Sequence, residues 1–98
     1  MTASNIYKDI TITSGEFIQV LTKLHYRKET EGNYYRFVND KYNSIVILPI
    51  QPLDESVLKV HLATYTFRLQ LQGVIKQEED IIKMVEKNRL KTKSLVHV

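Results

Sequence analysis

The stretch from Tyr26 to Pro49 constrains the fold most, because two clusters of turn-forming residues divide it into three short runs. The first cluster is Glu31-Gly32-Asn33, in which glycine and asparagine tolerate the positive φ of a tight hairpin. The second runs from Asn39 to Asn43 and is rich in residues that favour turns. This pattern predicts an antiparallel meander of three strands.

The residue types of the runs support strands. Residues 34–38 are aromatic and β-branched, which suits a pleated, half-buried surface. Residues 45–48 form a continuous apolar run that ends at Pro49, as is typical of a central or well-covered strand.

A helix is predicted before the meander. Thr13 and Glu16 have the spacing of a capping box, in which each side chain satisfies a free amide of the first turn. One apolar stripe follows at helical spacing, formed by Phe17, Val20, Leu21 and Leu24. The helix should end near His25, whose position favours a capping role.

A second helix should follow the meander, capped by Asp54 or Ser56 and extending to Gln72. Two neighbouring stripes predict a wide core-facing surface: Val57, Val60, Thr64, Phe67 and Leu71, and beside them Leu58, Leu62, Tyr65 and Leu69. Residues 67–72 also alternate as a strand does, but the length of the run favours a helix. Gly73 is then expected at C′, in the left-handed conformation.

A third helix is expected from Lys76 to Leu90, with acids at its start and bases at its end. The sequence therefore predicts a small α+β domain of order α-β-β-β-α(-α), with helices packed on one face of a three-stranded sheet. We expect one domain with its core in residues 14–90, and with residues 1–12 and 91–98 peripheral.

Composition limits the chemistry of the 98-residue chain. It has no cysteine, so disulfides and thiolate metal sites are excluded. No apolar run reaches the length of a membrane helix, so we expect a cytoplasmic protein without a membrane partner. The net charge of +3 is mildly basic. The positive residues concentrate in two regions: Lys23, Arg27, Lys28, Arg36 and Lys41, and then Lys87, Arg89, Lys91 and Lys93.

Several short motifs share an order with a known family. These are residues 16–26, then Gly32-Asn33-Tyr34, residues 35–38, Val46-Ile47-Leu48-Pro49, residues 69–74 and residues 78–82. Over roughly residues 14–90 this order resembles the HicA-like toxin family, small bacterial proteins with a fold like a double-stranded-RNA-binding domain. The resemblance implies a ribonuclease of a toxin–antitoxin system, held in check by an antitoxin.

The chain departs from that family at the catalytic position. Tyr34 stands where the family has the histidine of its Gly-Ser-His motif, and Asn33 stands where it has serine. Imidazole exchanges a proton near neutral pH, whereas a phenol is a poor base there. The resemblance therefore implies a catalytically degenerate domain that binds RNA, an antitoxin-like protein, or both.

The candidate RNA-binding residues gather in the first hairpin: Lys28, Gly32, Asn33, Tyr34 and Arg36. Aromatic rings stack on exposed bases, and arginine binds phosphate. Strand alternation places Tyr34 and Arg36 on one face of the sheet and Tyr35 and Phe37 on the other.

Two alternatives remain open. The first is a small protein-interaction module, which self-associates through an edge strand or the C-terminal helix and carries an exposed apolar patch. The second is an active ribonuclease that uses Tyr34, His25 or His61 in a rearranged site. The three histidines, the third being His97, lack metal-ligand spacing, so we expect no metal and no cofactor.

Overall fold

The computed structural model describes residues 6–96, with side chains up to residue 91. It confirms the α+β class and the order α-β-β-β-α-α. The elements are α1 (Ser14–Lys23), β1 (Arg27–Glu31), β2 (Tyr34–Asn39), β3 (Ser44–Pro49), α2 (Lys59–Leu71) and α3 (Glu79–Val96). The basic residue Lys93 belongs to this last helix, while His97 lies outside the described residues.

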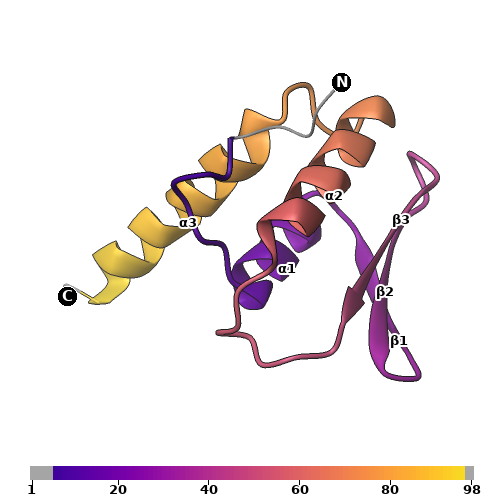
Figure 1. Ribbon diagram of the computed structural model, residues 1–98, viewed down its shortest axis with the longest axis horizontal. Helices are drawn as coiled ribbons and strands as arrows, with labels where there is room; N and C mark the ends of the chain where they lie inside the picture. The colour runs from indigo at the N-terminus through magenta and orange to yellow at the C-terminus, as the bar shows by residue number, and fades with distance from the viewer. Residues whose placement is uncertain (1–5, 97–98) are drawn as a thin grey trace.

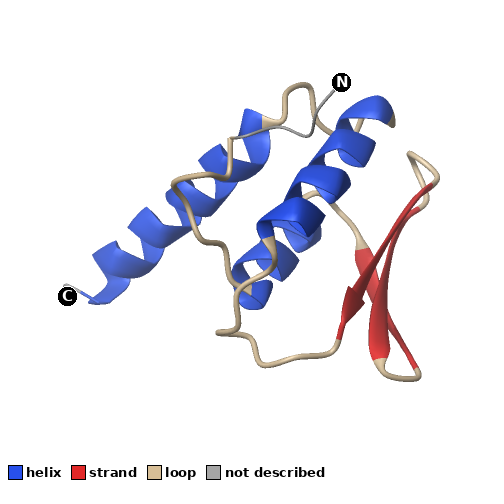
Figure 2. Ribbon diagram, viewed as in Figure 1, coloured by secondary structure: helices blue, strands red, loops and turns tan. Residues whose placement is uncertain are grey.

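The elements form layers (Figures 1 and 2). The three strands pair antiparallel in the order β1-β2-β3. Helices α1 and α2 lie against one face of this sheet, and α3 lies on the side of α1 and α2 away from the strands. The other face, which we call the outer sheet face, carries alternate residues of each strand: Arg27, Glu29, Glu31, Tyr34, Arg36, Val38, Ile45, Ile47 and Pro49.

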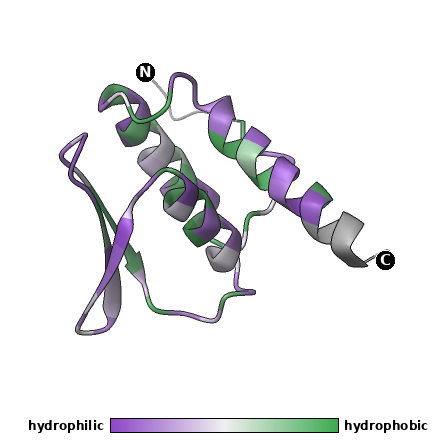
Figure 3. Ribbon diagram, turned by 180° about the vertical axis from the view of Figure 1, so that it is seen from behind, coloured by the Kyte–Doolittle hydropathy of each residue, from purple (hydrophilic) through white to green (hydrophobic). Residues whose placement is uncertain are grey.

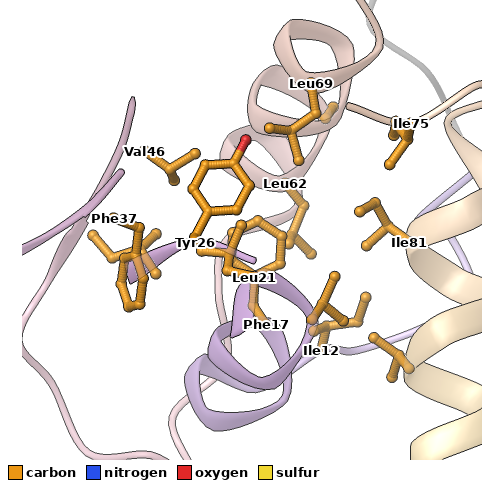
Figure 4. Packing of buried hydrophobic residues seen from close by; sticks show 14 of the residues in the cluster. Ile12, Phe17, Leu21, Tyr26, Phe37, Val46, Leu62, Leu69, Ile75 and Ile81 are labelled. Atoms are coloured by element: carbon orange, nitrogen blue, oxygen red, sulfur yellow. The ribbon is translucent and has the colours of Figure 1, made fainter. Parts of the chain in front are cut away.

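One hydrophobic core joins the layers (Figure 4). Phe37 and Val46 enter it from the sheet, Leu21 and Leu62 lie in the middle, and Ile81 closes it from α3. The N-terminal segment also takes part, because the side chains of Tyr7 and Ile12 are almost fully buried. The interpretation of residues 1–12 as peripheral is therefore wrong for the described residues 6–12, because the Tyr7 and Ile12 side chains belong to the hydrophobic core. Residues 1–5 lie outside the described residues.

Helix α1 begins and ends as its local sequence dictates. The capping box is present: the Glu16 amide donates to Thr13 Oγ1 over 3.2 Å, and the Thr13 amide donates to Glu16 Oε1 over 3.0 Å. The helix ends in a Schellman motif, in which the amides of His25 and Tyr26 donate to the carbonyls of Thr22 and Leu21. His25 thus caps the helix through its backbone, at a φ of 70°.

Two turns set the register of the meander. Gly32 has a φ of 61°, whereas Asn33 does not adopt a positive φ. Gly32 is therefore the one residue of this two-residue loop that supplies the positive φ, as in a type II′ turn. In the second turn Asn43 has a φ of 52°, and the Asn39 carboxamide accepts from the Tyr42 amide.

Strand β3 lies at an edge of the sheet, so its interpretation as central or well covered is wrong. Val46 and Leu48 point into the core, while Ile47 is 49% exposed on the outer sheet face. The free edge is partly blocked: Pro49 has no amide to offer, and the Tyr65 hydroxyl donates to the Ile47 carbonyl over 3.0 Å. Figure 3 shows the contrast between hydrophilic β1 and hydrophobic β3.

Helix α2 starts later than the sequence suggested. Its N-cap is Leu58, without a side-chain hydrogen bond, so neither Asp54 nor Ser56 caps it. Ser56 instead pairs with Thr13 in an isolated bridge, which holds the connection against the start of α1. The helical assignment up to residue 71 is confirmed, and Gly73 closes the helix with a φ of 82°.

Helix α3 begins at Glu79. The Asp80 carboxylate in its first turn accepts hydrogen bonds from the amides of Lys76 and Gln77, which precede the helix. It continues to Val96, so the expected end at Leu90 is wrong and part of the expected tail is helical. Among the described helices, none combines the length and the apolar character that crossing a bilayer requires.

Candidate functional site

The outer sheet face brings arginines and carboxylates together. Arg36 Nη1 lies 2.8 Å from Glu29 Oε1, and Arg27 Nη1 lies 2.5 Å from Glu29 Oε2. The second Arg27 amino group lies 3.3 Å from Asp40. The hydrogen bond from Arg36 is the main reason that the pKa of Glu29 is lowered. Both arginine charges are therefore largely compensated by neighbouring acids.

The predicted RNA-binding residues divide between the two faces. Tyr34 and Arg36 share the outer sheet face, as expected from alternation. Lys28 lies opposite Phe37 in the register and so belongs to the other face, where its ammonium group sits 4.7 Å from the Tyr35 ring centre. Gly32 and Asn33 form the exposed turn. The five residues consequently do not make one continuous surface.

Tyr34 has no histidine beside it in the sheet. Its hydroxyl donates to the Glu31 carboxylate over 3.3 Å. His25 precedes β1, whereas Tyr34 follows the turn at the other end of that strand. His61 lies on α2, with its ring 6.4 Å from that of Tyr65. No two of these groups form the hydrogen-bonded acid–base pair that a ribonuclease needs.

A hollow of about 310 Å³ lies between the end of β3 and the start of α2. Its lining is Ser14, Leu48, Pro49, Gln51, Glu55, Ser56, Val57, Leu58, His61 and Tyr65. Of the residues that line the hollow, Ser56 and His61 come closest in type to a catalytic nucleophile and its base. The structure has no hydrogen bond between these two side chains. Within residues 6–96, no cluster of histidine and acidic side chains has the arrangement of a metal site.

Helix α2 turns an apolar stripe toward solvent. Val60, Phe67 and Leu71 are 62%, 46% and 72% exposed, and Thr64 lies between them on the same side. The prediction that this stripe faces the core is wrong. The core side is formed by Leu62, Ala63, Thr66 and Leu69. We call the exposed stripe of residues 60, 64, 67 and 71 the α2 seam.

The sequence alone does not show that the α2 seam is exposed. Apolar residues occupy every side of α2, so periodicity indicates two stripes without telling which is buried. The buried side is fixed by contacts with residues distant in sequence. Leu62 and Leu69 pack into the core, and the Tyr7 hydroxyl lies 2.5 Å from Thr66 Oγ1 there.

The charged side chains of α2 itself are all basic. Residues 59–72 contain Lys59, His61 and Arg68 and no carboxylate. Arg68 is exposed and forms no ion pair within the described part of the chain. The nearest acids along the chain are Asp54 and Glu55 in the connection before α2, and Glu78 after it. The α2 seam thus combines apolar side chains with a positive margin.

Comparisons of the chain with protein-family models, with curated proteins and with solved structures gave no match. The similarity to the HicA-like family therefore stays a prediction from short motifs.

Proposed function

We propose that the domain is a protein-interaction module that docks a partner protein on the α2 seam. The observation that carries this proposal is the exposure of Val60, Phe67 and Leu71 on one side of a well-formed helix. Contiguous exposed apolar residues mark interaction sites.

The energetic argument favours a partner over an idle surface. Burial of apolar area contributes about 25 cal/mol per Å², so covering three large side chains gives several kcal/mol of gross binding energy. The positions recur by four and three residues, which is the spacing of a helix–helix interface. A partner helix would therefore meet all four residues of the α2 seam at once.

The catalytic alternative has weaker support. Tyr34 is engaged with Glu31, and the histidines His25 and His61 lie on other elements. A degenerate toxin-like domain that retains a protein partner fits both this geometry and the family resemblance, because family members are held by an antitoxin.

Photo-crosslinking tests the proposal directly. A photoreactive amino acid replaces Leu71 on the α2 seam and, in a matched control, the exposed Lys83 on α3. In the cell that encodes the chain, we expect a discrete protein adduct from position 71 and none from position 83. An adduct lost on nuclease treatment, equal adducts from both positions, or no adduct would overturn the proposal.

RNA contact is the second candidate, favoured by a groove between α1 and α3. This groove has a volume of about 360 Å³ and is lined by Ile18, Gln19, Thr22, Lys23, Asn88 and Lys91. Two lysines and no carboxylate line it, unlike the outer sheet face, where Glu29 compensates the arginines. Lysines in such a groove attract phosphates in a salt-dependent manner.

A titration separates the two RNA surfaces. Labelled single- and double-stranded RNA is titrated with wild type, Arg36→Ala, Tyr34→Ala and the double variant Lys23→Gln/Lys91→Gln, at low and moderate salt. Binding weakened only by the lysine changes supports the groove, and binding weakened by the other two supports the outer sheet face. Absence of binding at low salt excludes RNA as a ligand, and any cleavage reopens the enzyme alternative.

A further inference from the structure

We infer that the partner presents an amphipathic helix with acidic flanks to the α2 seam. This inference rests on the proposed function and adds the chemistry of the partner. It follows from the geometry of the α2 seam and from the charges beside it.

The geometry of the α2 seam fits a helix. Val60, Thr64, Phe67 and Leu71 follow the d-a-d-a pattern of a heptad repeat, so their side chains form a nearly straight row along α2. An extended peptide is bound by main-chain pairing with a sheet edge, and a helix such as α2 offers no such edge. The row therefore suits the apolar face of a second helix.

The charges select an acidic partner. In the same heptad frame His61 and Arg68 occupy the e positions beside the α2 seam, and Lys59 lies at its start. The e and g positions set the choice of partner through interhelical ion pairs. The Lys59 ammonium already donates to the Lys8 carbonyl, but it keeps its charge, and the Arg68 guanidinium is exposed. Carboxylates on the partner would pair with these groups.

A second copy of the chain is a poor occupant by the same argument. In an antiparallel pair of α2 helices, Arg68 of each copy would lie near His61 of the other, and neither copy offers an acid from residues 59–72. The Arg68 guanidinium of each copy would therefore lack a carboxylate to pair with at these positions. The absence of acids thus points to a different chain as partner.

Two designed peptides test the inference. Each has about three heptads with leucine at a and d; one carries glutamate and the other lysine at e and g. Fluorescence anisotropy measures their binding to the full chain, at a peptide concentration that keeps each peptide monomeric. We expect the acidic peptide to bind about tenfold more tightly than the basic one at low salt, with the preference reduced by added salt.

Variants of the protein complete the test. Arg68→Glu should remove or reverse the preference, Phe67→Ser should weaken both peptides, and Lys83→Glu on α3 should change neither result. Equal binding of both peptides, or tighter binding of the basic one, overturns the acidic preference but leaves the α2 seam as a docking site. If neither peptide binds while position 71 still crosslinks to a protein, the partner is not such a helix and the inference fails alone. If both experiments are negative, the proposed function fails with it.

Discussion

Arg89 on α3 and Glu16 in the first turn of α1 lie 73 residues apart in sequence, with 2.5 Å between Arg89 Nε and Glu16 Oε2. Arg89 Nη2 donates to Glu16 Oε1 over 2.9 Å and to the Thr11 carbonyl over 2.6 Å. Glu16 also completes the capping box with Thr13. One carboxylate therefore both starts α1 and holds α3 against it.

The two hydrogen bonds from the Arg89 guanidinium to the Glu16 carboxylate should contribute measurably to stability. We expect Arg89→Gln to lower the free energy of unfolding by about 1 kcal/mol, because hydrogen bonds to charged groups are strong but this arginine is 44% exposed. Arg89→Lys keeps the positive charge but not the paired hydrogen bonds, so it should lower the free energy of unfolding by about half as much. Urea unfolding followed by circular dichroism measures the change, with Lys91→Gln on the same helix as the control. An unchanged midpoint in Arg89→Gln would contradict this role.

The same pair should make stability depend on acid. The hydrogen bond from Arg89 is the largest cause that lowers the pKa of Glu16 below its ordinary value of 4.5. A carboxyl group with a lowered folded-state pKa stabilises the fold above about pH 4.5 and loses this contribution as the pH falls through the folded-state pKa. We therefore expect the difference between wild type and Arg89→Gln to shrink as unfolding is measured from neutral pH to pH 3. A difference that stays constant over this range would show that the ion pair does not act through Glu16.

Local signals carried most of the sequence-based prediction of the fold. The capping box at Thr13, the glycine turn at Gly32 and the helix end at Gly73 each depend on a few neighbouring residues, and the structure confirms all three. Such signals act before any tertiary contact forms, so they can be recognised in the chain alone.

Tertiary contacts decided what the sequence could not. The edge position of β3 follows from the predicted meander, in which the third strand pairs on one side only, but the apolar run of β3 does not show it because such a run is alike in an edge strand and in a central one. The outward orientation of the α2 seam depends on the core contacts of the opposite side, where Leu62 and Leu69 are buried and Thr66 meets Tyr7. Likewise, the compensation of Arg36 depends on Glu29, which lies opposite it in the register.

His25 should be replaceable with a gain in stability. It occupies C′ of α1 with a φ of 70°, a conformation that costs a residue with a Cβ roughly 1 kcal/mol. Its side chain is exposed and makes no hydrogen bond among the described residues. We expect His25→Gly to raise the free energy of unfolding by about 0.5–1 kcal/mol.

Lys23→Gly is the matched control for this substitution, because it places the same residue two positions earlier, in the last turn of the helix. It should destabilise the protein by about 0.5–1 kcal/mol. Thermal or urea unfolding of both variants gives the comparison. A loss of stability in His25→Gly would mean that the imidazole stabilises the native state through its side chain.

Alkaline pH should unfold the domain through its buried tyrosines. Burial raises the pKa of Tyr7 from 10.0 to about 12, with smaller contributions from Glu78 and Glu79, while the hydrogen bond with Thr66 acts in the opposite direction. A folded-state pKa above the unfolded value means that stability is complete below about pH 10 and is lost as the pH rises toward 12. The loss from Tyr7 should reach about 2–3 kcal/mol.

Tyr7→Phe isolates this contribution. At neutral pH it should cost about 1 kcal/mol, because the Thr66 hydroxyl loses its partner in the core. Between pH 10 and 12 its stability should fall less steeply than that of wild type, although burial also raises the pKa values of Tyr26 and Tyr65, so some slope should persist. Tyr34→Phe, which removes a hydroxyl from the outer sheet face, is the control and should run parallel to wild type. If Tyr7→Phe and wild type also lose stability in parallel, Tyr7 ionises only after the fold has opened for another reason.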